Sequence, residues 1–561
     1  MRASVGLGLV CSLWLGCTQS EPEVETPAPP EPVLAGDPVP EAGTPAPGGN
    51  IRVALAAEPK HLNPQLEPLD PWGRKIANLV YSPLAAPHPE TFAPQARLAK
   101  SWDISDDRRT LTFHLRQNVR WHDGERFTAE DVVFTFEKLL DPTSRTQSHR
   151  RFLAPLGKFE RLDAHTVRFH LTTAHWYAFD AIAETRIYPE HIFNKGDFNT
   201  HPANRSPVGT GPFRFQSWKP NERIVLTDHA SYFGAGPHVE RLEFILKPAA
   251  KARAKLARQG NVDVIEHLPP ETWYSLARNP SITNKFWRLR HSPSLLQLIA
   301  WNTRHAAFRD RRVRRAVTML LDRHAILQNF RLGLDLAAAS WFYPGTRSHA
   351  RGPETPLPHD PDAAQRLLER AGWVDSDADG VRDRDGKPFR FTLTYPQGSR
   401  FYEQLAATLQ RDFGAAGIEV STAKLTWQTL RRRLHSGAFD ACALLWHVGP
   451  RTDPYPIWHS SAAAEGKNFT AFKNDRVDSL LEKARAALDA DQRASLYGRL
   501  DALLREHQPY TLLFRRQHLS LVAKRLGGIV PTPHGVFDYA RMYVRSPDSP
   551  RAPKDSPPGD Q

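Results

Sequence analysis

The chain has 561 residues, of which 40% are hydrophobic, so it can build large cores and corresponds to about three or four ordinary domains or to one composite fold. Lys and Arg outnumber Asp and Glu, and the formal net charge of +13 permits anionic partners without deciding the fold. Three cysteines exclude a disulfide scaffold and a multi-cysteine metal module. No apolar run reaches the roughly 20 residues of a membrane-spanning helix, which excludes a polytopic membrane protein.

The first 17 residues have the pattern of an export signal. Arg2 supplies a positive charge, residues 5–15 are apolar, and a small residue precedes Cys17. The stretch ending in Leu-Gly-Cys resembles the lipobox of bacterial lipoproteins, although Trp14 stands where leucine is usual. We therefore predict acylation of Cys17 and a membrane-anchored lipoprotein outside the cytoplasm, in the periplasm or at the cell surface. Ordinary signal cleavage with an incidental cysteine is the alternative.

Two terminal segments are too poor in apolar residues to fold. Residues 18–50 are rich in Pro, Ala, Gly and Glu and contain no aromatic residue, Lys or Arg. Such a composition predicts a disordered tether. The tail over 546–561 is similarly rich in Pro and Asp and is predicted to be disordered as well.

Between these termini, strand and helix patterns interleave. Apolar alternation predicts strands at 51–57 and 110–116, and again around Phe169. Thr128 with Asp131 forms a capping-box pattern that starts a helix. Further helices are predicted around 313–321, from Pro361 to Gly372, and over 475–488 and 492–506, with a strand at 389–395 between them. Interleaved strands and helices predict an α/β fold.

Several segments in chain order are similar to the family 5 extracellular solute-binding proteins, the peptide- and nickel-type receptors of ATP-driven bacterial importers. Each segment alone is a weak signal, and their common order makes the resemblance strong. The strongest match runs from Leu111 to Phe134 and contains Trp-His-Asp-Gly-Glu at 121–125. The other similar segments are the Pro-Val-Gly-Thr-Gly-Pro-Phe turn at 207–213 and the stretches 302–323, 360–373 and 437–454.

The resemblance implies a two-lobed clamp of the periplasmic-binding-protein type, in which a solute lies between lobes that close by a hinge motion. It implies that residues 51–75, 205–291 and 505–545 form lobe I, that 76–204 form an extra subdomain on it, and that 292–504 form lobe II. The implied function is capture of a peptide or peptide-like solute and its delivery to the permease subunits of an ABC importer. The receptor is expected to be a monomer without a cofactor.

The segment that begins at Trp446 is the leading candidate for ligand contact. In peptide-binding relatives an aspartate shortly after this tryptophan holds the peptide's α-ammonium, but here Gly449 or Pro450 stands near that place and Asp453 aligns with a later Asp-Pro. A buried ammonium without a partner costs several kcal/mol, so we expect a nonstandard recognition of amines. Arg451 offers a site for an anionic group, with a solvated loop arginine as the alternative.

The indole of Trp446 offers a large rigid surface for stacking, which predicts a pocket wall, with a place in the hydrophobic core as the alternative. Weaker candidates for the cleft are His447, His61, Asn63, Trp301 and Asn302.

One acidic segment matches the start of a calcium loop. Asp375, Asp377 and Asp379 precede Gly380, but Gly386 occupies the twelfth position, where a bidentate Glu is required. The alternative is an acidic hairpin without metal.

No motif supports catalysis, since the sequence lacks HExxH, GxSxG and paired cysteines, and a hydrolase is therefore disfavoured. The densest basic runs, Arg311–Arg315 and Arg431–Arg433, lie on predicted helices with one apolar face, which is typical of a solvated helix surface rather than of a nucleic-acid site. A sensing or cell-wall-fragment-binding lipoprotein of the same fold, without a permease, remains the alternative to a transport receptor.

Overall fold

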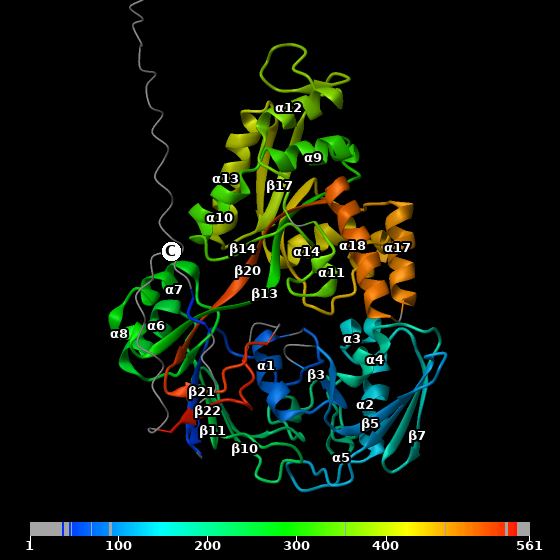
Figure 1. Cartoon of the computed structure of the whole chain (residues 1–561), viewed down its shortest axis with the longest axis vertical. Helices are drawn as coiled ribbons and strands as arrows, with labels where there is room; N and C mark the ends of the chain where they lie inside the picture. Colours follow the sequence, from blue (N-terminus) through cyan, green and yellow to red (C-terminus); the bar gives the residue numbers. More distant parts are fainter. Residues whose placement is uncertain are drawn as a thin grey trace, which may run out of the picture.

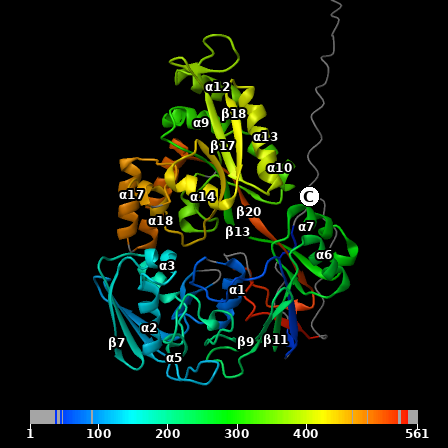
Figure 2. The same cartoon turned by 180° about the vertical axis from the view of Figure 1, so that it is seen from behind.

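The structure is a computed structural model of the whole chain, and it describes residues 36–38, 44–46, 48–68, 70–88, 92–353, 355–465, 467–487, 489–532 and 537–546. Two lobes lie one above the other, and strands β13 (Phe286–Trp301) and β20 (Tyr510–Ala523) run from one into the other (Figure 1). The reverse view shows the same division (Figure 2). Strands and helices alternate through both lobes, which confirms the predicted α/β class.

A mixed sheet of 11 strands extends through both lobes of the described chain. β13 and β20 pair antiparallel, and their register shifts between His291 and Leu295, whose partners are His518 and Arg516. This irregularity marks the junction of the lobes. The strands in spatial order are β18 (Glu419–Leu425), β17 (Arg390–Pro396), β19 (Ala441–His447), β13, β20, β12 (Val264–Ile265), β2 (Asn50–Leu55), β11 (Arg241–Leu246), β10 (Arg223–Asp228) and β9 (Phe213–Lys219), with β14 (Leu336–Ala337) beside β20.

The extra subdomain carries a sheet of four strands in the order β5-β6-β8-β7. The alternation predicted for 110–116 is confirmed, because Leu111, Phe113 and Leu115 are buried while their neighbours are half-buried. The capping box at Thr128 is confirmed too, and it starts a helix in which Asp131 accepts from the Thr128 N–H at 2.9 Å. These elements are β5 (Ala99–Ile104), β6 (Thr110–Leu115), β7 (Leu156–Asp163), β8 (Thr166–Leu171), α2 (Ala129–Leu140), α3 (Gln147–Phe152), α4 (Ala178–Ala183) and α5 (Glu190–Phe193).

Lobe I and the extra subdomain share one hydrophobic core. That core contains Ile51 and Phe244 of the large sheet together with Phe113 and Phe169 of the small sheet. We therefore expect the subdomain to move with lobe I. The other elements here are α1 (Pro71–Val80), α6 (Ala250–Gln259), α7 (Pro270–Ala277), α8 (Pro280–Thr283), a 3-10 turn at Pro202–Asn204, and the small strands β1 (Pro45–Ala46), β3 (Ala85–Pro87), β4 (Pro94–Ala96), β21 (Leu526–Gly527) and β22 (Tyr543–Arg545).

The turn at 207–213 fastens the family signature to α1. Added Cβ atoms at Gly209 and Gly211 would lie 1.9 Å from the carbonyl oxygen of Val80 and 2.4 Å from that of Leu79. His122 joins the same turn, because its Nδ1 accepts from the Gly209 N–H and its Nε2 lies 3.0 Å from the Gly211 carbonyl oxygen. Both segments thus act as scaffold.

Lobe II has two hydrophobic cores of its own, one on each face of its part of the sheet. The helices predicted around 313–321, from Pro361 to Gly372, and over 475–488 and 492–506 are all present, with ends within two residues of those expected. The helices are α9 (Arg311–Met319), α10 (Arg323–Arg331), α11 (Arg347–Ala350), α12 (Pro361–Arg370), α13 (Arg400–Gly414), α14 (Trp427–Ser436), α15 (Tyr455–Trp458), α16 (Ala462–Glu465), α17 (Asp475–Ala486) and α18 (Ala490–His507), with a 3-10 turn at Ala307–Arg309 and a small hairpin of β15 (Asp383–Arg384) and β16 (Lys387–Pro388).

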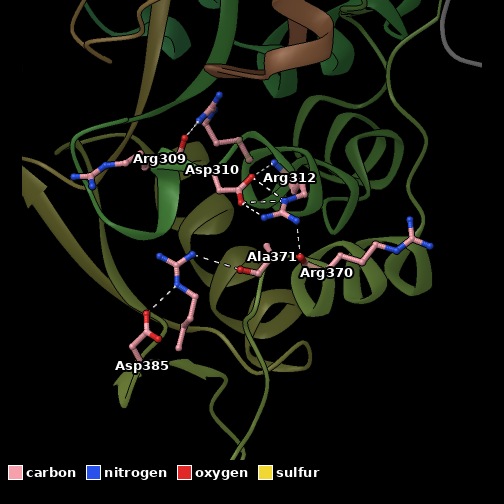
Figure 3. Close-up of polar contacts among 8 residues, drawn as sticks. Arg309, Asp310, Arg312, Arg370, Ala371 and Asp385 are labelled. Atoms are coloured by element: carbon pink, nitrogen blue, oxygen red, sulfur yellow. Dashed lines mark hydrogen bonds and ion pairs between the residues drawn. The ribbon is translucent and has the colours of Figure 1, made fainter.

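The arginines of α9 make more contacts within the protein than the sequence predicts (Figure 3). Arg312 forms a two-pronged ion pair with Asp310 and donates to the Arg370 carbonyl. Arg314 is buried and donates to the carbonyls of Phe308 and Arg309. The expectation of a uniformly solvated face is therefore wrong for Arg314, whose guanidinium closes the start of the helix.

Three predicted boundaries require correction. The limit at 75/76 falls inside α1, whose N-cap is Asp70 and whose apolar residues are buried as far as Val80. Residues 505–514 belong to lobe II rather than lobe I, because Leu513 and Phe514 pack in a lobe II core. The tether ends before Asn50, since β1 pairs with β22 and Asp37 forms an ion pair with Arg288.

Residues 18–35 of the predicted tether and 547–561 of the predicted tail lie outside the described residues, as does Cys17. Cys442 is free and fully buried. In the described part of the chain, no helix combines the length and the hydropathy that crossing a membrane requires.

Candidate functional site

The junction of the lobes contains a group of three histidines, two buried and one half-buried. His267, from the loop after β12, has its Nδ1 2.7 Å from Nδ1 of His518 on β20, and the His518 ring lies 5.9 Å from that of His291 on β13. Burial lowers the pKa of all three to about 3, so they are neutral at pH 7. Neutral rings can accept as well as donate hydrogen bonds, which suits a polar wall that carries no charge.

A buried ion pair holds α1 beneath this group. The ammonium of Lys75 contacts the carboxylate of Glu266, whose other oxygen accepts from the hydroxyl of Tyr539 at 3.0 Å. The backbone N–H of Phe537 donates to the same oxygen at 3.2 Å. Because both carboxylate oxygens of Glu266 have partners, the ion pair fixes α1 and the C-terminal loop to the sheet.

Lobe II meets this wall with the end of β19, where two predicted residues lie. Trp446 is half-buried and stacks on Phe469, with ring centroids 5.7 Å apart, while the ammonium of Lys467 lies 6.0 Å from its ring. Part of the His447 side chain is exposed, but the protein around its ring removes water from it, and this desolvation together with the charge of Arg74 on α1 lowers its pKa. Trp446 and His447 are both predicted ligand residues, and the structure brings them to the junction.

The loop after β19 fastens lobe II to the extra subdomain. The guanidinium of Arg451 forms ion pairs with Asp180 and Glu184, at α4 and its C-cap. Burial raises the pKa of Asp180 to about 7 even though Arg451 opposes the rise. Arg451 therefore already has two carboxylate partners across the lobe boundary, and we name these three side chains the interlobe clamp.

Asp453 is engaged within lobe II. Its carboxylate accepts two hydrogen bonds from Arg485 on α17, at 2.6 and 3.0 Å, and the same guanidinium lies 3.5 Å from the centre of the Tyr455 ring. A ligand amine would have to compete with this arginine for the carboxylate. The structure therefore favours a structural role for Asp453.

His61 and Asn63 are buried in the loop after β2 and hold that loop in shape. The Oδ1 of Asn63 accepts from the backbone N–H groups of Gln65 and Leu66 and from the hydroxyl of Tyr188. His61 lies 3.3 Å from the carbonyl oxygen of Pro68 and accepts from the N–H of Asn63. The polar side-chain atoms of these two predicted cleft residues are therefore bonded within the loop and its surroundings.

Trp301 and Asn302 lie in the interior of lobe II rather than at a cleft. The Trp301 side chain is fully buried and donates to the hydroxyl of Thr511 at 2.9 Å. Asn302 donates to the carbonyls of Gly437 and Phe439 and so fixes the turn before β19. Their role as predicted cleft residues is not supported by this position, because packing has taken up both side chains.

Asp375, Asp377 and Asp379 come together, with one ligand atom of each within 4.8 Å of the others, but all three are exposed. Their loop leads into the small hairpin of β15 and β16 that the sequence offered as the alternative. Among the described residues, this is the one group of three or more His, Cys, Asp or Glu side chains with such spacing.

Sequence reasoning missed Arg74, which reaches the same junction from the first half of α1. Its charge acts on His149 of α3 and on His447 of β19, so it lies between the extra subdomain and lobe II. Nothing in the local sequence marks Arg74, because its position depends on three segments distant in the chain.

Comparison with known proteins agrees with this architecture. The oligopeptide-binding protein AppA of Bacillus subtilis is 29% identical over 504 residues, which cover 87% of this chain and 90% of the relative. Its structure in complex with a nonapeptide superimposes with a TM-score of 0.73 at 27% identity, covering 90% of this chain and 100% of that one. The nickel-binding periplasmic protein of Escherichia coli is 26% identical over 423 residues, covering 73% of this chain and 78% of the relative.

A solved structure of lower identity shows the same fold. NikA of Brucella suis, solved with Fe(III)-EDTA, has a TM-score of 0.78 at 21% identity and covers 89% of this chain and 100% of that one. The family model described as the middle part of the bacterial extracellular solute-binding proteins of family 5 matches residues 93–468. The chain therefore belongs to the bacterial extracellular solute-binding proteins, family 5.

Proposed function

We propose that this protein is the solute receptor of an ABC importer, which captures a peptide or peptide-like molecule between its lobes and delivers it to a membrane permease. The observation that carries the proposal is the junction itself. Lobe II is one continuous segment, so the chain crosses between the lobes at two places, in β13 and in β20, where the register is irregular. Two adjacent crossings are suited to a hinge that opens and closes the space between the lobes.

The named ligands of the relatives support the chemical class. AppA of Bacillus subtilis is called an oligopeptide-binding protein, and its structure contains a nonapeptide. In this chain we expect Trp446 to lie against the solute and His447 to contact it from lobe II, because both sit at the junction. Arg451 and Asp453 already have ionic partners, so we expect Arg451 to govern closure and Asp453 to stabilise lobe II, and neither to hold the solute.

We further propose that the receptor is exported and tethered to a membrane through an acylated Cys17. Radiolabelled palmitate should be incorporated into the wild-type protein and not into Cys17→Ser, which should appear in the soluble fraction. Equal labelling of both proteins, or a wild-type protein found in the cytosol, would contradict this part of the proposal.

The transport role has a direct test. A strain lacking the protein should take up a bound peptide more slowly than its parent, and small-angle X-ray scattering should show the purified protein contracting when that peptide binds. Mass spectrometry should recover the peptide unaltered, because the proposal assigns no chemistry to the protein. Binding and contraction with undiminished uptake would instead favour a sensing or cell-wall-fragment-binding lipoprotein. Cleavage of the peptide would refute the proposal.

A further inference from the structure

Arg74 is a cation at the lobe junction without a counter-charge. Its side chain is exposed, and it makes no ion pair or side-chain hydrogen bond with any described residue. Enclosure by the surrounding protein nevertheless lowers the pKa of its guanidinium. Both observations hold for a side chain whose end is exposed while several segments surround it. α1 lies directly below lobe II, between β13 and α3, in both views (Figures 1 and 2).

Two further cations face each other near this space. Lys467 of lobe II is exposed, lies over the ring of Trp446, and has its pKa lowered by enclosure and by the charge of Arg151. Arg151 belongs to α3, and it too is exposed and makes no ion pair with the described residues. The charges of Arg151 and Lys467 therefore approach each other from the two sides of the lobe boundary.

Four carboxylates of the same region already have cationic partners. Asp180 and Glu184 share Arg451, Asp453 has Arg485, and Glu266 has Lys75. Removing a charge from bulk water without a partner is costly, so three cations without an ion-pair partner among the described residues favour an anion that supplies one. A guanidinium is suited to a carboxylate, because it can donate two parallel hydrogen bonds.

We propose that the space between the lobes selects an acidic solute, one with more carboxylates than amines, and that a carboxylate of this solute pairs with Arg74 while the remainder extends toward Lys467 and Trp446. This inference rests on the proposed receptor function and specifies its ligand. It also accounts for the missing aspartate near Gly449, since such a solute does not depend on a carboxylate in the protein to hold an ammonium.

Two pools of synthetic tri- to pentapeptides provide the test. One contains Asp and Glu, and the other is identical except that Asn and Gln replace them. After incubation of the full-length protein with each pool and gel filtration, mass spectrometry identifies the retained peptides. We expect retention from the acidic pool. Preferential retention from the amide pool would overturn the inference.

Calorimetry with a retained acidic peptide then tests the residue. Arg74→Gln should weaken binding by about tenfold or more, because it removes a charge-assisted pair, and Arg74→Lys should restore part of the loss. Arg258→Gln, on the exposed surface of α6, is the matched control and should bind like the wild type. Equal affinity of Arg74→Gln and wild type would refute the assignment.

The ligand-free protein tests the premise by itself. If Arg74 lacks a partner, the melting temperature of ligand-free Arg74→Gln should equal or exceed that of the wild type, and a fall of several degrees would show that Arg74 has a structural role instead.

Citrate separates the two proposals. If neither pool is retained but citrate raises the melting temperature of the wild type and not of Arg74→Gln, the anionic site stands and the peptide-like ligand fails. If neither pool is retained and citrate has no effect, the inference fails.

Discussion

The interlobe clamp predicts that Arg451→Ala shifts the protein toward an open state. In this structure Arg451 contacts Asp180, whose side chain is 8% exposed, and Glu184, whose side chain is 33% exposed. Removing the guanidinium leaves two carboxylates close to each other at a partly buried boundary. Opening the lobes returns both carboxylates to water, so the substitution penalises the closed state more than the open one.

The magnitude follows from burial. Loss of one partner from a buried ion pair costs about 3–5 kcal/mol when the remaining charge stays ionised. Burial already raises the pKa of Asp180 to about 7, so this carboxyl avoids part of the cost by taking up a proton, and the more exposed Glu184 contributes little. We therefore expect the substitution to raise the free energy of the closed state relative to the open state by about 2–3 kcal/mol. This change raises the ratio of open to closed protein by about 30- to 150-fold.

Small-angle scattering at pH 7.5 measures the outcome. The radius of gyration of ligand-free Arg451→Ala should exceed that of the wild type, and ligand should bind more weakly. Arg390→Ala is the matched control, because it removes an arginine from an exposed pair with Glu419 inside lobe II. Identical scattering of wild type and Arg451→Ala, in the presence and absence of ligand, would refute the reasoning.

Three further predictions concern packing, ligand contact and acid stability. Gly209→Ala places a Cβ 1.9 Å from the Val80 carbonyl oxygen and should lower the free energy of unfolding by about 2–4 kcal/mol in denaturant titration. Gly236→Ala, whose Cβ meets open space, is the control and should leave the free energy of unfolding unchanged. Equal stability of the two variants would contradict the role of the turn. Trp446→Ala should weaken binding of a retained peptide by at least about 1 kcal/mol in calorimetry, and unchanged affinity would assign the indole to packing against Phe469 alone. The melting temperature should fall from pH 7.5 to pH 5, because the histidines take up protons on unfolding at any pH between their folded pKa values and 6.5. Each net proton taken up lowers the free energy of unfolding by about 1.4 kcal/mol per pH unit, and these histidines outnumber the carboxyls that act in the opposite sense. A constant or rising melting temperature would count against the burial of the histidines. The histidines with a pKa of about 3 are His122, His149, His267, His291 and His518, and the opposing carboxyls are Asp131, Asp180 and Asp501.

The sequence by itself determined the local structure, because the forces responsible act within a few residues. The alternation at 110–115 determines which side chains of β6 are buried, and Thr128 with Asp131 determines where α2 begins. The same holds for Asp360 and Pro361 at the start of α12. The order of these segments was also enough to indicate the family.

Tertiary structure alone decided which of the candidate residues face the junction. Trp301 and Trp446 have the same side chain at the end of neighbouring strands, yet one is fully buried and the other half-buried, since the helices that cover each strand come from elsewhere in the chain. Arg451 pairs with carboxylates more than 260 residues away, and Arg74 has no carboxylate partner in the described part of the chain. Whether a charged side chain has a partner depends on the segments that pack around it, and the sequence next to that side chain does not indicate which segments these are.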